Sequence, residues 1–283
     1  MLISVIITTF NHENYISKTI SSVLSQKQNI LDIELIIGDD CSSDNTYIKI
    51  KEAIEMSNLD RVVLKKNKHN LGVSQNIFNC INIAKGDYIC FLDGDDYWTD
   101  NRKLENQIQI MQEKKVDFVF DGVKYIDKND KELNINYNET PKNFDDIFLG
   151  KGYIHTSSTM YSKKALERIK ITSSKFLQND IALLDILFWL SAVENLDFFY
   201  NEKVSTAYRK DISSMSNSNQ VDKLLFMNKN ILTTLIFFFK RNKKIKYLPT
   251  IIRRTYLFFK FSLMKKNLKK LFVDLVKIFT LKV

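Results

Sequence analysis

The chain has 283 residues, of which 45% are hydrophobic, so it can bury a core of ordinary size and is not expected to be disordered. Its formal net charge is +9, but this charge is unevenly distributed. Residues 221–283 carry 16 Lys and Arg against 2 Asp and Glu, whereas residues 1–220 carry 26 against 31. The basic surface therefore belongs to the C-terminal segment, and it indicates an anionic membrane surface or a nucleic acid as partner.

Several classes of protein are disfavoured by what the sequence lacks. The three cysteines, Cys41, Cys80 and Cys90, show neither zinc-binding spacing nor a disulfide framework, which is typical of a reducing compartment. The N-terminal run MLISVIITTF has no basic residues before its apolar part, so we expect a buried strand rather than a signal peptide. No stretch reaches the roughly 18 apolar residues that a membrane-spanning helix requires.

The first half of the chain alternates between short apolar runs and amphipathic stretches about ten residues long. Continuous β-branched runs separated by helices predict a parallel sheet covered on both faces, which is a doubly wound α/β domain. The runs are residues 2–7, 33–37, 61–64, 88–92 and 118–120, and the helical stretches are residues 15–24, 46–56, 73–84 and 104–112.

The second half is less regular. Residues 127–130 predict a hairpin turn and residues 134–145 a polar surface loop. Residues 154–161 are a candidate strand and residues 181–193 a candidate helix. From about residue 220 the chain is predicted to be helical to its end, so we divide it into an α/β domain, 1–220, and a basic amphipathic tail, 221–283.

Polar and acidic residues follow the predicted strands, where ligands bind in open α/β sheets. Thr8 follows the first run, Asp39 and Asp40 the second, and the sequence D-G-D-D at residues 93–96 the fourth. Carboxylates crowded at a strand end favour a hard divalent cation that also bridges phosphates, and a solvated turn is the alternative. Neither G-x-G-x-x-G nor G-x-x-x-x-G-K-[ST] is present, so the usual dinucleotide and phosphate-loop signatures are missing.

Four ordered motifs resemble family 2 glycosyltransferases with the GT-A fold: SVIITTFN, ELIIGDDCSSD, NLGVSQN and AKGDYICFLDGDDYW. The resemblance covers about residues 1–210. It implies a donor-binding part over residues 1–120 and an acceptor and catalytic part over 121–220. Two residues depart from the family pattern: Cys41 stands where Gly is usual, and Gln75 where Arg often precedes Asn76.

The resemblance also assigns roles to residues at the strand ends. It implies that the donor nucleotide contacts Thr8, Asp39, Asp40, Asn76 and Asp93. It further implies that Asp93 and Asp95 hold manganese or magnesium, with Asp96 beside them.

For the general base, the resemblance points to Asp185 in LLDILFWLSA, with Asp180 as the alternative. Either aspartate could instead be an N-cap or first-turn acid of a helix. His155 and Thr156 are candidates for the acceptor side.

The implied reaction is a single displacement that inverts the anomeric carbon of a UDP-linked hexose. The acceptor would be a hydroxyl of a cell-surface polysaccharide, lipopolysaccharide or lipid-linked saccharide. The sequence lacks Q-x-x-R-W and spanning helices, so addition of one sugar is favoured over processive synthesis. A nucleotidyltransferase on a related fold is the alternative enzyme.

The tail combines apolar stripes with basic residues. One stripe includes Leu271, Leu275 and Ile278, and an earlier one includes Ile251 and Phe258. Such helices suit an anionic membrane interface, so we expect a cytoplasmic enzyme bound peripherally to the membrane. The alternative is a tail packed on the catalytic domain. Nucleic-acid binding is not expected, because the periodic apolar residues would be buried and no reading motif is present.

Overall fold

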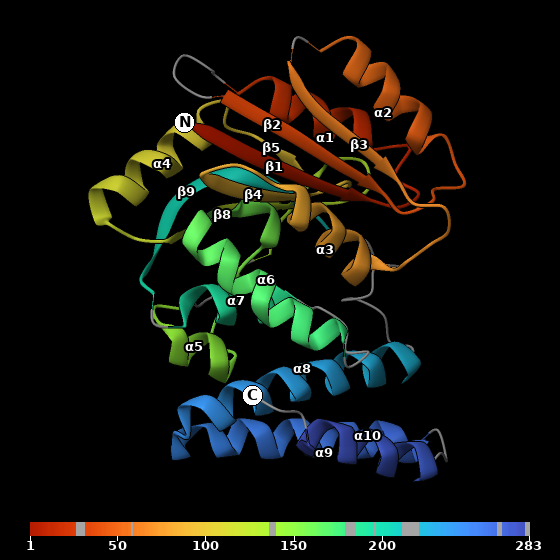
Figure 1. The fold of residues 1–283 in the computed structure, drawn as a ribbon, viewed down its shortest axis with the longest axis vertical. Helices are drawn as coiled ribbons and strands as arrows, with labels where there is room; N and C mark the ends of the chain where they lie inside the picture. The colour runs from red at the N-terminus through yellow and green to blue at the C-terminus, as the bar shows by residue number, and fades with distance from the viewer. Residues whose placement is uncertain are drawn as a thin grey trace.

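The computed structural model describes residues 1–26, 32–57, 59–135, 140–178, 185–194, 196–210, 221–264 and 268–280. Figure 1 shows a twisted sheet with helices against it, and a separate layer of C-terminal helices at the opposite end of the molecule. The helices α5 (Phe144–Leu149), α6 (Lys163–Leu177) and α7 (Asp185–Val193) lie between the sheet and this layer.

The first four long strands are parallel, in the order β3-β2-β1-β4, as the apolar runs predict. Each strand extends beyond its apolar run, so that Thr8, Asp39 and Asp93 are among the last paired residues of their strands. These strands and the helices that follow three of them are β1 (Leu2–Thr9), α1 (Ile16–Leu24), β2 (Asp32–Asp39), α2 (Thr46–Glu55), β3 (Arg61–Lys66), α3 (Val73–Ile83) and β4 (Tyr88–Asp93).

Beyond β4 the sheet is mixed. The strand β8 pairs antiparallel with both β4 and β6, β6 pairs parallel with β9, and β5 pairs antiparallel with β9. The β5–β9 pair brings the end of β9 next to the D-G-D-D segment. The elements are β5 (Tyr97–Trp98), α4 (Lys103–Lys114), β6 (Phe118–Ile126), β7 (Glu132–Leu133), β8 (Thr159–Ser162) and β9 (Phe198–Arg209).

Several local predictions need correction. Only the last three residues of the candidate strand 154–161 are β-structure, at the start of β8 (Thr159–Ser162), because Thr156–Ser158 form a 3-10 turn. The predicted loop 134–145 ends in the first turn of α5, and its residues 136–139 lie outside the described residues. The predicted turn at 127–130 is confirmed, because it joins β6 to β7 and is closed by a hydrogen bond from the Asp127 N–H to the Lys131 carbonyl at 2.9 Å.

The sheet separates two buried clusters, because successive side chains of a strand point to opposite faces. Val5 and Ile7 of β1 face α1, α2 and α4, whereas Ile6 faces α3, α6 and α7. Both faces are covered, which confirms the α/β class with helices on each side.

The C-terminal helices are α8 (Val221–Asn242), α9 (Leu248–Met264) and α10 (Leu268–Thr280). Leu232, Phe237 and Phe238 of α8 are buried in the same cluster as α6 and α7. The core is therefore continuous on both sides of residues 211–220, which lie outside the described residues, and α8 packs on the catalytic domain.

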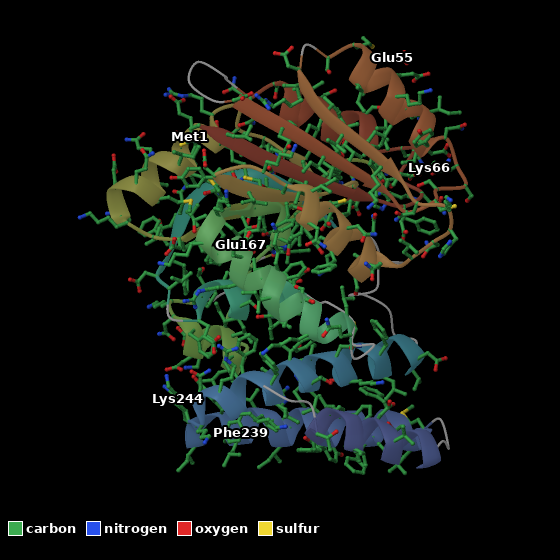
Figure 2. All side chains as sticks on the ribbon, viewed as in Figure 1. Met1, Glu55, Lys66, Glu167, Phe239 and Lys244 are labelled. Atoms are coloured by element: carbon green, nitrogen blue, oxygen red, sulfur yellow. The ribbon has the colours of Figure 1, made fainter. Side chains whose placement is uncertain are left out.

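Polar and aromatic contacts reinforce this packing. Arg241 pairs with Glu194 at 2.8 Å, and the rings of Tyr247 and Phe148 stack with centroids 3.9 Å apart. Lys244, labelled beneath α5 in Figure 2, contacts Asp145 at 3.1 Å. Among the described residues, no helix combines the length and the apolarity needed to cross a bilayer.

Candidate active site

Two cavities meet at Asp93, which lines both of them. One, of about 400 Å³, lies at the carboxyl ends of β1, β2 and β4, and we call it the donor cavity. The other, of about 410 Å³, extends toward α7 and α8, and we call it the acceptor cavity. The donor cavity is lined by Thr8, Thr9, Phe10, His12, Asp40, Asn70, Gly72, Val73, Asn76, Asp93 and Asp95.

The D-G-D-D segment is held by hydrogen bonds from distant parts of the chain. Asp96 is buried, and its two carboxylate oxygens accept bonds from the Ser157 hydroxyl at 2.6 Å and the Arg209 N–H at 2.7 Å. The Arg209 guanidinium also donates to the Asp95 carbonyl at 2.9 Å. Asp96 therefore lines neither cavity and fixes the positions of Asp93 and Asp95.

Position 94 requires glycine because neighbouring side chains leave no room for a Cβ atom, and its backbone angles are not unusual. A Cβ atom there would lie 2.6 Å from the Thr9 hydroxyl oxygen and 2.7 Å from His12 Nδ1. The close approach lets β1 and β4 end against each other, which brings Thr8 and Asp93 into one cavity.

The acidic residues are close enough to shift one another's pKa values. Burial and then the charges of Asp95 and Asp185 raise the pKa of Asp93 to about 8. Burial and the neighbouring Asp95 and Asp93 raise the pKa of Asp96 well above its usual value. In the parts of the chain that the structure describes, no Lys or Arg forms an ion pair with any of these four aspartates. The site is therefore short of positive charge.

That deficit fits a divalent cation, although the described residues hold no group of three or more His, Cys, Asp or Glu arranged for a metal. Magnesium is typically bound through one or two carboxylates together with substrate phosphates, so a complete protein cage is not needed. Asp93 and Asp95 both line the donor cavity and would supply such ligands, whereas Asp40 on the same wall is already bound by the loop before α3.

Asp40 is almost fully buried at the end of β2 and binds the loop before α3. Its carboxylate accepts hydrogen bonds from Asn67 Nδ2 at 2.9 Å, the Leu71 N–H at 2.8 Å and the Gly72 N–H at 2.9 Å. Asn76 donates to the Gly38 carbonyl at 2.9 Å. Asp40 and Asn76 thus line the donor cavity and also shape its wall.

Asp39 and Cys41, the two neighbours of Asp40 in the chain, do not line the donor cavity. Asp39 is completely buried and accepts hydrogen bonds from the Ser42 N–H and hydroxyl, so it does not line the donor cavity. Cys41 has a φ of 63°, a conformation that favours glycine, which explains why glycine is usual here.

Asp185 begins α7 and lines the acceptor cavity with Asp93. Burial raises the pKa of Asp185, and the neighbouring Thr156 side chain partly offsets this rise. Asp180, the alternative base, lies outside the described residues. The acceptor cavity is lined by Val73, Asp93, Pro141, Ile147, Gly150, Gly152, Tyr153, Ile154, Asp185, Ile186, Trp189, Tyr208, Met227, Ile231 and Arg254.

His155 and Thr156, the candidate acceptor residues, are buried and do not line this cavity. His155 Nε2 lies 2.6 Å from the Tyr125 hydroxyl, and its ring packs against Tyr208 at 4.3 Å between centroids. Burial lowers the pKa of His155 to about 3, so the imidazole is neutral and supports the aromatic wall from behind.

Sequence reasoning missed the residues that form that wall. Tyr153 and Trp189 pack edge to face with ring centroids 5.4 Å apart, and Tyr208 and Arg254 complete the lining. Trp189 lies within the segment LLDILFWLSA that was quoted for Asp185, and Arg254 is one of the basic residues of the tail, whereas no pattern singled out Tyr208. No local pattern marks Arg254 as a cavity residue.

The comparisons with known proteins agree with this geometry. The model of the family "Glycosyl transferase family 2" matches residues 4–170, more than half of the chain, so the chain belongs to this family. The match includes β1, β2, the D-G-D-D segment and α3.

A relative that matches is the Escherichia coli "UDP-Glc:alpha-D-GlcNAc-diphosphoundecaprenol beta-1,3-glucosyltransferase WfgD", 36% identical over 148 residues. The match covers 50% of this chain and 56% of WfgD, so the chain spans about half the length of that relative.

Two solved structures share the fold. S. aureus TarS in complex with UDP-GlcNAc superposes with a TM-score of 0.60 at 17% identity, covering 92% of this chain and 81% of that one. The mannosyltransferase PcManGT from Pyrobaculum calidifontis, in complex with GDP-Man and Mn2+, gives 0.55 at 12% identity, covering 92% and 73%. These likenesses confirm the GT-A type of fold that the sequence motifs predict.

Proposed function

We propose that this protein is an inverting glycosyltransferase that moves a hexose from a UDP-sugar to a hydroxyl of a lipid-linked saccharide. The observation that carries the proposal is that the donor and acceptor cavities share Asp93, with Asp185 on the acceptor side. A sugar bound across this junction would have its anomeric carbon between a nucleotide site and a carboxylate. Membership of the family and the substrate printed for WfgD support the choice of donor and acceptor.

In the proposed reaction, Asp185 accepts the proton of the acceptor hydroxyl as its oxygen attacks the anomeric carbon. The bond to the leaving diphosphate breaks on the opposite side, and the diphosphate leaves with the bonding electrons. One displacement therefore inverts the anomeric configuration. The raised pKa of Asp185 suits this role, because a base whose pKa approaches the working pH takes up a proton more readily.

Asp93 and Asp95 would hold manganese or magnesium in this proposal. When bound, the ion would neutralise charge on the donor diphosphate. The unpaired carboxylates of the site and the Mn2+ bound to a protein of the same fold support this assignment.

We also propose that the enzyme works at the inner face of the cell membrane. Ile252, Tyr256 and Leu263 of α9 are 65%, 65% and 55% exposed, and they follow helical spacing beside the exposed Arg253 and Lys260. An apolar helix face flanked by basic residues binds anionic lipid surfaces. A lipid-linked acceptor would be presented to the enzyme from such a surface.

The direct test measures UDP release from UDP-glucose in the presence of a GlcNAc-diphospholipid acceptor, with and without manganese. We expect release that requires both the acceptor and the metal. Asp95→Ala should reduce turnover at least about a hundredfold, because metal stabilisation of the leaving group is worth several kcal/mol. Unchanged turnover in EDTA or in the folded Asp95→Ala variant would contradict the metal assignment.

A further inference from the structure

The C-terminal helices supply one wall of the acceptor cavity. Met227 and Ile231 of α8 contribute apolar side chains, and Arg254 of α9 contributes a guanidinium. Arg254 donates a hydrogen bond to Asn228 Oδ1 at 3.2 Å. Over the described ranges, no Asp or Glu side chain forms an ion pair with Arg254.

A half-buried guanidinium without a counter-charge is unfavourable in the protein alone. Burial and then the adjacent Arg253 lower the pKa of Arg254. The planar guanidinium fork fits phosphate oxygens in pairs, so a phosphate entering the cavity would provide the missing charge and hydrogen-bond acceptors.

The other walls define how such a ligand would lie. Of the described residues that line this cavity, Arg254 is the only cation, so a phosphate entering the cavity would be attracted to the side formed by α8 and α9. The Trp189 indole N–H is buried and has no hydrogen-bond acceptor in the described structure. With Tyr153, the Trp189 ring offers an aromatic surface against which a sugar ring can pack.

We infer that Arg254 binds a phosphate group of the acceptor, so that the acceptor sugar lies along Tyr153 and Trp189 with its hydroxyl toward Asp185. This inference rests on the proposed function, because it concerns the acceptor side of the same site. Because Arg254 is positively charged, the cavity favours a sugar phosphate or sugar diphosphate over a neutral sugar. The helices of the tail thus take part in acceptor recognition.

The kinetic test compares two soluble acceptors with the same sugar, octyl-diphospho-GlcNAc and the neutral octyl glycoside of GlcNAc. Arg254→Gln should raise KM at least about tenfold for the diphosphate acceptor, the loss expected for a charge-assisted hydrogen bond. It should change KM for the neutral acceptor less than about twofold. Arg61→Gln removes an equal charge from the exposed start of β3, at the opposite end of this strand from the donor cavity, and should leave both values unchanged. Equal effects of Arg254→Gln on the two acceptors would overturn the inference.

A binding test separates this inference from the proposed reaction. Octyl diphosphate is titrated in EDTA, with intrinsic Trp fluorescence as the readout, and Arg254→Gln should weaken its binding at least about tenfold. If wild-type transfers no sugar but this dependence persists, the inferred site stands and the proposed function fails. If Arg254→Gln transfers normally to the diphosphate acceptor, the function stands and the inference fails.

Two further variants exclude a purely structural role. Asn228→Ala removes the hydrogen-bond partner of Arg254 but keeps its charge, so it should retain octyl diphosphate binding. A loss equal to that of Arg254→Gln would show that the helix contact alone matters and would overturn the inference. If Arg254→Gln does not fold, Arg254→Lys decides. It should bind octyl diphosphate several-fold more weakly than wild-type, because lysine lacks the planar fork, and unchanged binding would overturn the inference.

Discussion

At the scale of single residues, the site is a set of carboxylates placed at unequal depths. Both carboxylate oxygens of Asp96 accept hydrogen bonds from Ser157 and Arg209, whereas Asp93 lines both cavities. Asp185 reaches the same space from the start of α7. In the proposed reaction, these aspartates therefore divide into positioning, ligand-binding and proton-accepting roles according to their neighbours.

Asp185→Asn should lower kcat by a hundredfold to ten-thousandfold while leaving donor affinity nearly unchanged. The amide keeps the shape of the side chain but cannot accept the proton of the acceptor hydroxyl. Steady-state kinetics and UDP-glucose titration measure the two quantities. A small effect on kcat in Asp185→Asn together with a large loss in Asp180→Asn would identify Asp180 as the general base instead.

The pKa of Asp93 predicts how stability depends on pH. It is about 8 in the folded protein and about 3.9 in an unfolded chain, so the folded state binds more protons between these values. The free energy of unfolding should therefore fall as pH rises through this window in metal-free buffer. Urea unfolding at pH 5 and pH 8 should show a smaller fall in Asp93→Asn than in wild-type.

The surface variant Asp60→Asn serves as the control for this comparison and should behave like wild-type. Manganese and a donor should also reduce the fall in wild-type, because a bound cation favours the ionised carboxylate. An identical pH dependence in wild-type and Asp93→Asn would contradict the assigned pKa.

At the scale of elements, the donor cavity depends on one loop between β3 and α3. Asp40, at the end of β2, binds this loop through three hydrogen bonds, and Asn67 also donates to Asn76 Oδ1 at 3.0 Å. The loop then starts α3 at Gly72, whose φ of 80° places it outside helical geometry. These bonds hold the end of β2, the loop after β3 and the start of α3 together in one wall of the donor cavity.

Asp40→Ala should weaken UDP binding by about tenfold to a hundredfold, because hydrogen bonds to a charged group are worth about 1.5–3 kcal/mol. Isothermal titration with UDP and manganese measures this loss. Asn67→Ala is the matched variant, since it removes the side-chain bonds of Asn67 to Asp40 and Asn76 but leaves the Asp40 carboxylate in place. Equal losses would indicate that Asp40 acts by shaping the loop, and unchanged affinity in Asp40→Ala would exclude both roles.

At the scale of the whole molecule, the tail is both a packed part of the domain and an exposed surface. The helix α8 belongs to the main core, so deletion of residues 221–283 would remove Phe237 and Phe238 and uncover Phe176 and Phe144, whose rings pack against them. This deletion is expected to unfold the protein. The outer face of α9 keeps its apolar residues exposed. Membrane binding is therefore better tested by surface substitutions than by truncation.

The double variant Ile252→Glu and Leu263→Glu should lose at least about tenfold in binding to phosphatidylglycerol vesicles. Each buried aliphatic side chain contributes about 1.5–3 kcal/mol, and each added carboxylate is repelled by the lipid charge. Co-sedimentation at low and high salt measures the effect, and salt should weaken wild-type binding because exposed charges are screened.

Ile171→Glu is the control, since Ile171 is 62% exposed on α6, away from this surface. The control should sediment like wild-type. Failure of the wild-type protein to bind vesicles at any salt concentration would contradict the proposed membrane surface of α9.

The sequence by itself determined the parallel half of the sheet and the D-G-D-D segment, because each can be recognised from a short run of consecutive residues. Apolar runs followed by polar residues locate strand ends, and the carboxyl ends of parallel strands meet at one edge. Thr8, Asp40 and Asp93 were predicted from these strand ends, and Asn76 from the family resemblance. All four line one cavity.

Only the tertiary structure decided the acceptor side. Asp185, Trp189, Tyr208 and Arg254 come from α7, β9 and α9, and they meet because α8 packs on the catalytic domain. The same packing showed His155 to lie behind the cavity wall, although its sequence context favoured the acceptor side. Periodicity reports which face of a helix is apolar, but the partner of that face is chosen by burial across the whole chain.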